Sequence, residues 1–132
     1  MNIFVDTSAF LAILDADTPQ HPMARATWET VLQKGEHLII TNYVLLETFA
    51  LAQRRLGLKA VQTLQIDFIP VLAVHWIDEI SHSAGVAALF ASNRRQLSLV
   101  DCTSFQIMRQ LGIDTVFAFD QHFVEQRFVC IP

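Results

Sequence analysis

Cysteine is scarce in this sequence, with Cys102 and Cys130 as the only two. They lie 28 positions apart, and this number and spacing fit neither a disulfide framework nor a zinc site. Because cysteine is among the residues most often buried, we expect two buried, reduced thiols, as in a cytoplasmic protein.

Long apolar runs and a basic leader are also absent. No stretch reaches the roughly 18 uninterrupted apolar residues from which a membrane-spanning helix is inferred. The apolar start Met1–Leu14 has no basic segment before it and contains Asp6, which argues against a signal peptide. We therefore expect a cytoplasmic protein that does not enter a membrane.

An excess of positive charge is missing as well. The chain has 9 Lys and Arg against 13 Asp and Glu, with a net charge of −4, whereas a nucleic-acid-binding domain usually carries a basic patch. If the partner is a nucleic acid, a bound divalent cation would offset the repulsion. The composition is 52% hydrophobic and 17% charged over 132 residues, which excludes disorder and predicts one domain over residues 1–132.

Short apolar segments alternate with longer segments of helical period. The predicted strands are Ile3–Val5, His37–Thr41, Val71–Trp76, Thr115–Phe119 and Phe128–Ile131. The predicted helices are Ser8–Leu14, a helix capped by Thr18 that runs to Lys34, Asn42–Leu56, a helix from Leu58 that ends before Pro70, Asp78–Ser92 and Asp101–Leu111. Gly35, Gly57 and Gly112 follow three of these helices, as glycine commonly does at helix C-termini.

Strands that are apolar on both faces and separated by helices are typical of a parallel sheet covered on both sides. The sequence therefore predicts an α/β fold, a three-layer α/β/α sandwich with a short, mainly parallel sheet. Ligands of such folds bind at the carboxyl ends of the strands. Asp6 and Asp120 each follow a predicted strand directly, so we expect both at that edge.

Four acidic residues stand in apolar surroundings, unlike the other acidic residues of the chain. They are Asp6 in IFVDTSAF, Glu47 in YVLLETFALA, Asp101 in LSLVDCTSF and Asp120 in VFAFDQHF. A buried carboxylate is costly unless it has a cation, a hydrogen-bond partner or a proton. In the predicted helix over 42–56, the neighbours of Glu47 at spacings of three and four are mostly apolar, so protein should cover its face.

Each of these carboxylates also has a structural interpretation of its own. A buried ion pair with an arginine would account for Glu47, Asp6 and Asp101 could each be a helix N-cap, and Asp120 could cap a turn at Gln121–Phe123. All four explanations would then have to hold at once. A hard cation with oxygen ligands instead stabilises like charges gathered at one edge. We therefore predict these four carboxylates as the metal-binding and catalytic residues, with Mg²⁺, or Mn²⁺ in its place, as the cofactor.

A metal held by carboxylates can lower the pKa of a bound water, polarise a phosphodiester and stabilise the leaving oxygen. Hydroxyl groups flank two of the carboxylates and could hold either carboxylate oxygens or waters bound around the metal. They belong to Thr7, Ser8, Thr103 and Ser104. For Thr7 and Ser104, helix capping is the alternative interpretation.

Taken in order, these segments resemble the PIN-domain family of metal-dependent ribonucleases. The matching segments are VDTS at Val5–Ser8, NYVLLE ending at Glu47, SLVDCTSF at Ser98–Phe105 and FAFDQHF at Phe117–Phe123. They follow the order and spacing of the family across nearly the whole chain. By this resemblance Asp6, Glu47, Asp101 and Asp120 are the family's metal-binding acidic residues.

Two further features bear on the resemblance. His21 and Ala24 are similar to a histidine and an alanine of the family's second helix, and simple packing is the preferred explanation for both. Cys-Thr-Ser follows Asp101 where many members carry small apolar residues. This departure leaves the acidic set intact and leaves the subfamily and the substrate open.

A single PIN domain of this size resembles the toxin of a VapBC-type toxin–antitoxin pair. Such toxins cleave RNA, often dimerise and are inhibited by a small antitoxin encoded alongside. The resemblance implies a Mg²⁺-dependent endoribonuclease with an RNA substrate, a small antitoxin as partner and a homodimeric state. The alternatives are an RNA-processing or quality-control PIN nuclease without an antitoxin, and a PIN domain that binds but does not catalyse.

The roles of three further residues stay open. His122, two residues after Asp120, is a competing general base for attack by a ribose 2′-hydroxyl without metal. Arg54 and Arg55 could reach a substrate phosphate, or they could be solvated at a helix end, where they complement the helix dipole.

Two other classes of function lack their sequence signals. A phosphorylated carboxylate at Asp6 would need a second acid beside it or two residues later, and a lysine late in the chain. Instead Val5 precedes it, Ser8 stands two residues after it, and no lysine follows Lys59. A nucleotide-binding domain would need a Walker loop or a GxGxxG segment, and the chain has neither.

Overall fold

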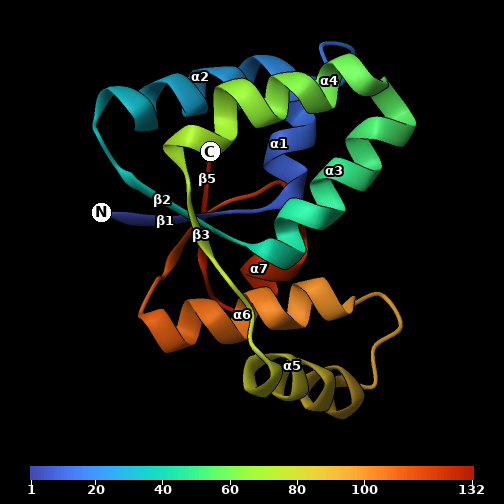
Figure 1. Ribbon diagram of the computed structural model, residues 1–132. Coiled ribbons are helices and arrows are strands. Elements are labelled where there is room, and N and C mark those ends of the chain that lie inside the picture. The colour runs from blue at the N-terminus through green and yellow to red at the C-terminus, as the bar shows by residue number, and fades with distance from the viewer.

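A sheet of five parallel strands lies between two layers of helices in the computed structural model, which describes all 132 residues (Figure 1). The strands are β1 (Asn2–Val5), β2 (His37–Thr41), β3 (Ala73–His75), β4 (Thr115–Phe117) and β5 (Val129–Ile131). Their order is β3-β2-β1-β4-β5, and each neighbouring pair is parallel. The predicted α/β/α sandwich is confirmed, with a sheet that is entirely rather than mainly parallel.

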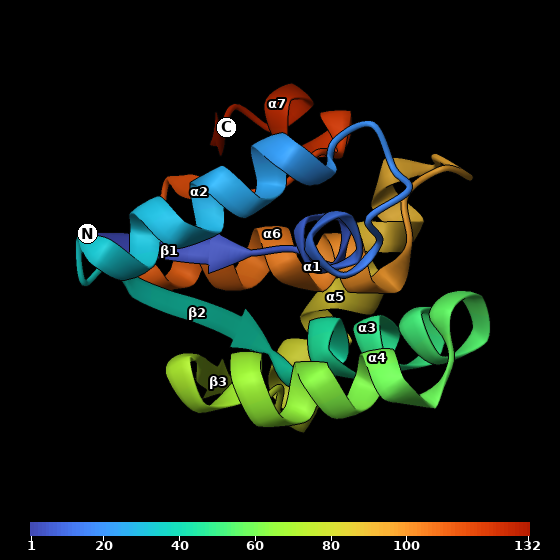
Figure 2. The ribbon, with the colours of Figure 1, turned by 90° about the horizontal axis from the view of Figure 1, so that it is seen from above.

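The helices cover both faces of this sheet. They are α1 (Thr7–Leu14), α2 (His21–Gln33), α3 (Asn42–Leu56), α4 (Leu58–Thr63), α5 (Glu79–Ser92), α6 (Leu99–Leu111) and α7 (Gln121–Glu125). Helices α1, α2, α3 and α4 gather above the sheet in Figure 1, and α5 and α6 lie below it. The view from above in Figure 2 shows α6 beneath the sheet and α2 over it. The glycines at 35, 57 and 112 end α2, α3 and α6 with positive φ, as predicted.

Aromatic side chains fill the space on both sides of the strands. One group joins α1, α2 and the segment after α4, and a second joins α6, α7 and the start of β5. The two groups consist of Phe10, Trp28 and Phe68, and of Phe105, Phe123 and Phe128. Full burial of one such side chain is worth about 1.5–3 kcal/mol. This packing holds the helices that carry the acidic residues in fixed positions.

The helix predicted from Leu58 to before Pro70 is shorter and less regular than expected. It divides into α4, a π-helical turn over Leu64–Phe68 and a 3₁₀ turn over Ile69–Val71. β3 therefore begins at Ala73 rather than at Val71. The 3₁₀ turn contains the proline, which removes a backbone donor and cannot continue a regular helix.

The start of α2 also differs from the prediction. Thr18 is not the N-cap, because its hydroxyl donates to Gln20 Oε1 at 2.6 Å. The helix begins at His21 with Pro22 in its first turn. Pro22, rather than Pro19, thus occupies the early helical position that needs no backbone donor.

The residue that caps α3 is one position earlier than predicted. Thr41 Oγ1 accepts a hydrogen bond from the Val44 backbone N at 3.1 Å. The Asn42 side chain accepts instead from the Ile77 backbone N at 2.6 Å. Asn42 therefore ties the start of α3 to the segment between β3 and α5, which places the two helices near each other.

The structure also bears on the two exclusions made from the sequence. No helix combines the length and apolar character needed to cross a bilayer. Both cysteines are free thiols, but only Cys102 is buried, and Cys130 in β5 is half-buried. The expectation of two buried thiols is therefore correct for one of them.

Candidate active site

The sheet order brings the ends of β1 and β4 side by side where the chain's connections diverge. From β1 the chain continues outward to β2 and β3, whereas β4 and β5 are added on the other side. A crevice forms at such a point, outside the carboxyl ends of the strands, and ligands of α/β folds bind there. Asp6 directly follows β1, and Asp120 comes three residues after β4, which ends earlier than predicted. Both carboxylates stand at this edge.

Asp6 is the N-cap of α1 and is only 4% exposed. Its Oδ2 accepts hydrogen bonds from the Ser8 backbone N at 3.1 Å and from Ser8 Oγ at 2.7 Å. Ser8 Oγ in turn accepts a bond from the Phe119 backbone N at 3.0 Å. Ser8 therefore links the end of β1 to the segment that carries Asp120. The N-cap interpretation of Asp6 is correct, and it does not remove the residue from the acidic edge.

Asp101 occupies the third position of α6, not the N-cap position that the sequence suggested. The helix begins two residues earlier than predicted, because Ser98 caps it. Ser98 Oγ accepts from the Asp101 backbone N at 3.0 Å, and Asp101 Oδ2 accepts from the Ser98 backbone N at 3.1 Å. This reciprocal capping box fixes the carboxylate at the helix start.

Asp120 caps α7, as its turn-capping interpretation predicted. Its Oδ1 accepts from the His122 backbone N at 2.9 Å. Ligand atoms of Asp101, Asp120 and His122 all lie within 4.8 Å of one another. Sequence reasoning considered His122 only as a competing base and missed it as a member of this group. The Asp-x-His spacing at the start of a helix is the signal that could have found it.

Two charged residues, Glu125 and Arg94, form a chain of contacts that begins at the His122 ring. Its Nδ1 lies 3.4 Å from Glu125 Oε2, and Glu125 pairs with Arg94 at 2.8 Å. The Nε2 of the ring lies 4.0 Å from Asp120 Oδ1. This arrangement gives the ring carboxylate neighbours on two sides, which suits a histidine that orients an acidic group.

Glu47 lies in α3 and is half-buried. Its predicted apolar surroundings are only partly correct, because Val44 is buried but Ala50 is exposed. No arginine or lysine forms an ion pair with Glu47. The alternative of a buried salt bridge is therefore wrong.

Electrostatic coupling shows that the four carboxylates share one region. Burial raises the pKa of Asp6 from 3.8 to about 6, and the charges of Asp101 and Asp120 add to this rise. Burial also raises the pKa of Glu47, with the same two charges contributing. The pKa of Asp101 is raised by burial and by Asp120, while its bonds to Ser98 and the neighbouring His122 oppose the rise. The cluster therefore concentrates negative charge with which no lysine or arginine forms an ion pair.

This donor set fits a hard divalent cation. Carboxylate oxygens are the ligands that Mg²⁺ and Mn²⁺ prefer, and a cation would oppose both the burial and the smaller mutual repulsion that raise these pKa values. Asp101 and Asp120 lie closest together, with His122 beside them. Asp6 and Glu47 contribute charge to the same region.

The four nearby hydroxyl groups have different surroundings. Ser8 bonds directly to Asp6, and the Thr7 hydroxyl opposes the rise in the pKa of Glu47. Thr7 Oγ1 also accepts from Thr48 Oγ1 at 3.1 Å. Thr103 and Ser104 are fully buried, and their hydroxyls have no hydrogen-bond partner. Neither of these two holds a carboxylate, so that part of the expectation is wrong, and Thr7 and Ser104 cap no helix.

The two arginines at the end of α3 differ in their relation to the acidic edge. Arg55 lines a hollow of about 240 Å³ together with Ser8, Asp15 and Phe119. Ser8 and Phe119 are the residues that connect Asp6 to the Asp120 segment. Arg54 is exposed and does not line this hollow. Of the two arginines, only Arg55 therefore borders the hollow beside Ser8, the residue that is bonded to Asp6.

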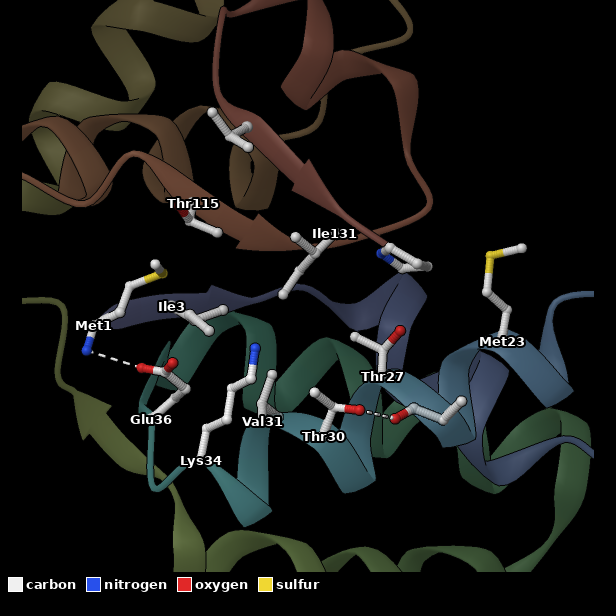
Figure 3. A pocket seen from close by; sticks show the side chains of 13 residues that line it. Met1, Ile3, Met23, Thr27, Thr30, Val31, Lys34, Glu36, Thr115 and Ile131 are labelled. Carbon is white, nitrogen blue, oxygen red and sulfur yellow. Dashed lines mark hydrogen bonds and ion pairs between the residues drawn. The ribbon is translucent and has the colours of Figure 1, made fainter.

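Another hollow, of about 450 Å³, lies between α2 and the strands β1, β4 and β5 (Figure 3). Its lining is largely apolar and includes Ile3, Val31 and Ile131. The N-terminal amino group pairs with Glu36 at 2.8 Å along one side. None of the four clustered carboxylates reaches this space, so it is not the candidate active site.

His21 and Ala24 have packing roles, as expected. The Nδ1 of His21 lies 2.9 Å from the Ala12 carbonyl oxygen. Ala24 is completely buried. Both residues hold α2 against α1 and stand apart from the acidic cluster.

The sequence pattern of the PIN domain matches residues 3–129. The chain belongs to the PIN-domain family. Over 128 residues it is 34% identical to the 23S rRNA-specific endonuclease VapC20 of Mycobacterium tuberculosis, covering 96% of this chain and 95% of that protein. As a PIN-domain nuclease of the VapC type, the chain has the family that its sequence predicted.

Solved structures share the fold of this PIN domain. The crystal structure of M. tuberculosis VapC20, described as a sarcin-ricin loop cleaving toxin, superposes with a TM-score of 0.85 at 34% identity over 96% of both chains. FitAcB from Neisseria gonorrhoeae has a TM-score of 0.69 at 14% identity, covering 100% of this chain and 97% of that one. VapBC2 from Rickettsia felis, solved with a DNA fragment from its promoter, has a TM-score of 0.67 at 12% identity, covering 98% and 97%.

Proposed function

We propose that this protein is a Mg²⁺- or Mn²⁺-dependent endoribonuclease and the toxin of a VapBC-type toxin–antitoxin pair. It acts as one PIN domain over residues 1–132, with Asp6, Glu47, Asp101 and Asp120 as its metal-binding and catalytic residues. The observation that carries this proposal is the uncompensated carboxylate cluster at the ends of β1 and β4. It occurs in a chain that is 34% identical to an rRNA-specific endonuclease.

The chain's own residues prepare this edge for phosphodiester hydrolysis. A bound divalent cation supplies an activated water and stabilises the leaving oxygen. Asp101 and Asp120 are held by helix-start hydrogen bonds, and Asp6 is held by Ser8. These bonds fix carboxylate oxygens before the substrate arrives. Such preorganisation is the main source of electrostatic catalysis.

The proposed partner is a small antitoxin, since VapC20, with 34% identity to this chain, is described as a toxin. Its cognate antitoxin would prevent cleavage by covering the acidic edge. We place the pair in the cytoplasm, where RNA and reduced thiols occur together.

The proposed homodimer is supported by an unpartnered apolar face of α5. Ile80, Ala84 and Ala87 follow one another at helical spacing and are all exposed. Phe90 on the same helix is 76% exposed, and Trp76 before the helix is 71% exposed. Exposed apolar side chains gathered on one helix are typical of a protein–protein interface.

Cleavage of RNA tests the proposed function directly. The purified protein should cut an RNA hairpin with the sarcin–ricin loop sequence in the presence of Mg²⁺ or Mn²⁺, and EDTA should stop the reaction. If a bound cation activates the attacking water, hydrolysis would break the bond between phosphorus and the 3′-oxygen, so the products should carry a 5′-phosphate and a 3′-hydroxyl. End-group analysis by mass spectrometry checks this. Cleavage that persists in EDTA, or products with a 2′,3′-cyclic phosphate, would contradict the proposal.

Arg55 is expected to contact a substrate phosphate, whereas Arg54 is not. Removal of one phosphate contact to a single strand lowers the slope of log K against log salt by about 0.7. Arg55→Ala should show this change in RNA binding, measured by fluorescence anisotropy over a salt series. The matched control is Arg54→Ala, which alters the neighbouring position and the same charge. Equal slopes for the two variants would leave both arginines as solvated residues of the helix end.

A further inference from the structure

A third hollow, of about 340 Å³, adjoins the carboxylate cluster on the side of α3 and is referred to below as the side pocket. One wall comes from a single face of α3, where Tyr43, Leu46, Glu47 and Ala50 recur at helical spacing. Glu47 therefore belongs to both the cluster and the side pocket. The volume of the side pocket falls at the lower end of the range of about 300–1,000 Å³ that is typical of small-ligand sites.

The opposite wall of the side pocket comes from α5 and from the first turn of α6. His82 contributes from α5, and Leu99 and Val100 contribute from α6. Val100 directly precedes Asp101. One of the four proposed catalytic residues, Glu47, therefore lines the side pocket, and the same turn of α6 that lines it also carries Asp101.

Tyr43 and His82 form an aromatic pair within this lining. The Tyr43 hydroxyl is hydrogen-bonded to His82 Nδ1, and the ring centroids lie 5.8 Å apart at an interplanar angle of 77°. Both rings are half-buried. The bond satisfies the phenol, so the pair adds a largely apolar aromatic surface to the aliphatic side chains around it.

The charge of the side pocket favours the base of a nucleotide over its phosphate. Its lining has no lysine or arginine, and its one acidic side chain is Glu47. A phosphate would be repelled there. A base would not, because it is uncharged and stacks on aromatic side chains, which is how proteins commonly hold unstacked RNA bases.

We propose that the side pocket receives one unstacked base of the RNA, belonging to a nucleotide next to the phosphate that is cut. This inference rests on the proposed ribonuclease function and adds a subsite to it. The backbone lies at the carboxylates, and the base turns into the space between α3, α5 and α6. Tyr43 provides the principal stacking surface, and His82 positions it. The subsite makes cleavage depend on a base that can leave its stack.

The test compares three RNAs and, first, two proteins, the wild type and Ala50→Phe. One RNA is the loop hairpin described above, and the other set replaces the base on either side of the cut by an abasic ribose, one position at a time. Ala50→Phe fills the side pocket without removing any of its groups. For the wild type, we expect one abasic position to lower kcat/KM about 10-fold, mainly through KM, as the loss of one stacked base predicts. On the intact RNA, Ala50→Phe should have a kcat/KM about 10-fold below that of the wild type. On that abasic RNA, its kcat/KM should equal that of the wild type.

Three comparisons keep the result specific. Tyr43→Leu removes the aromatic surface and should give the same pattern as Ala50→Phe. Ala26→Phe, at an exposed alanine of α2 outside the side pocket, should cleave both RNAs as the wild type does. Circular dichroism and metal-induced stabilisation of each variant should match the wild type, because none of these substitutions removes a proposed metal ligand.

Several outcomes would overturn the subsite. Wild-type cleavage that is insensitive to both abasic positions would do so. The subsite also fails if Ala50→Phe lowers kcat/KM, relative to the wild type on the same RNA, by the same factor on the intact and the abasic RNA. A change in oligomeric state in Ala50→Phe without a change in RNA cleavage would also overturn it, because the side pocket would then belong to a protein interface. If the wild type cuts no RNA at all, the proposed function fails by itself. The side pocket is then judged by equilibrium binding of the same RNAs, where equal affinities overturn it.

Discussion

Asp6→Asn and Asp101→Asn should each lower RNA cleavage by about 10²–10³-fold or more, with most of the loss in kcat. Removal of one group that stabilises transition-state charge typically has an effect of this size. Asn keeps the shape and an oxygen acceptor, so the capping bonds at Ser8 and Ser98 can persist. Single-turnover cleavage at saturating Mg²⁺ measures the effect. Asp17→Asn, which alters an exposed acid outside the cluster, is the matched control and should cleave normally.

His122→Ala separates the metal mechanism from a histidine mechanism. The His122 ring lies beside Asp120 and is held by Glu125. Loss of a partner that orients a metal ligand costs about 10–100-fold, so the variant should keep measurable activity with 5′-phosphate products. Complete loss in His122→Ala together with near-normal cleavage by the two Asn variants would reverse the assignment and make His122 the general base.

Millimolar Mg²⁺ or Mn²⁺ should raise the melting temperature of the wild type at pH 7.5. A ligand that binds only the folded state at 100 times its Kd adds about 2.7 kcal/mol to the free energy of unfolding. For a domain of this size each kcal/mol corresponds to several degrees. Differential scanning fluorimetry with a metal series checks this. An unchanged melting temperature in the wild type and in the cluster variants would mean that these carboxylates do not hold a metal.

Asp6→Asn should stabilise the metal-free protein and weaken the effect of metal. The pKa of Asp6 is raised from 3.8 to about 6, so the folded state binds more protons than the unfolded state between these values. The resulting destabilisation is absent below pH 3.8, grows as pH rises and is complete above about pH 6. At pH 7.5 the substitution should therefore add up to about 3 kcal/mol to the free energy of unfolding. The gain should vanish near pH 4, and Asp17→Asn should show none.

Much of the fold was predictable because it depends on local pattern. Strands such as Ile3–Val5 and His37–Thr41 are apolar on both faces, and only a sheet covered on both sides buries them. Alternation with helices then predicts parallel connections. Helix starts were less predictable, because a single hydrogen bond decides between neighbouring candidates. Thr41 rather than Asn42 caps α3 since the Asn42 side chain bonds to Ile77, a residue 35 positions away.

The four carboxylates could be found from sequence because each stands in an apolar segment, where a charged group is costly to bury. An acid in an apolar segment such as VFAFDQHF has few neighbours that could solvate it, so its presence indicates a ligand or a special bond. The positions of Asp6 and Asp120 at one edge followed from the predicted parallel sheet. Their mutual effects on pKa depend on distances across the fold, which no local pattern contains.

The amino-acid sequence by itself determined the parallel α/β architecture, the PIN family and the identity of the clustered acids. Only the tertiary structure decided that His122 stands beside Asp101 and Asp120 and that Arg55, not Arg54, lines the hollow next to Ser8. The same is true of the partial exposure of Glu47. Periodicity tells which side of a helix a residue occupies, but how far that side is covered depends on the packing of elements distant in the chain. Adjacent residues on a helix point about 100° apart, so the rotation of α3 about its own axis decides which of the two arginines lines that hollow.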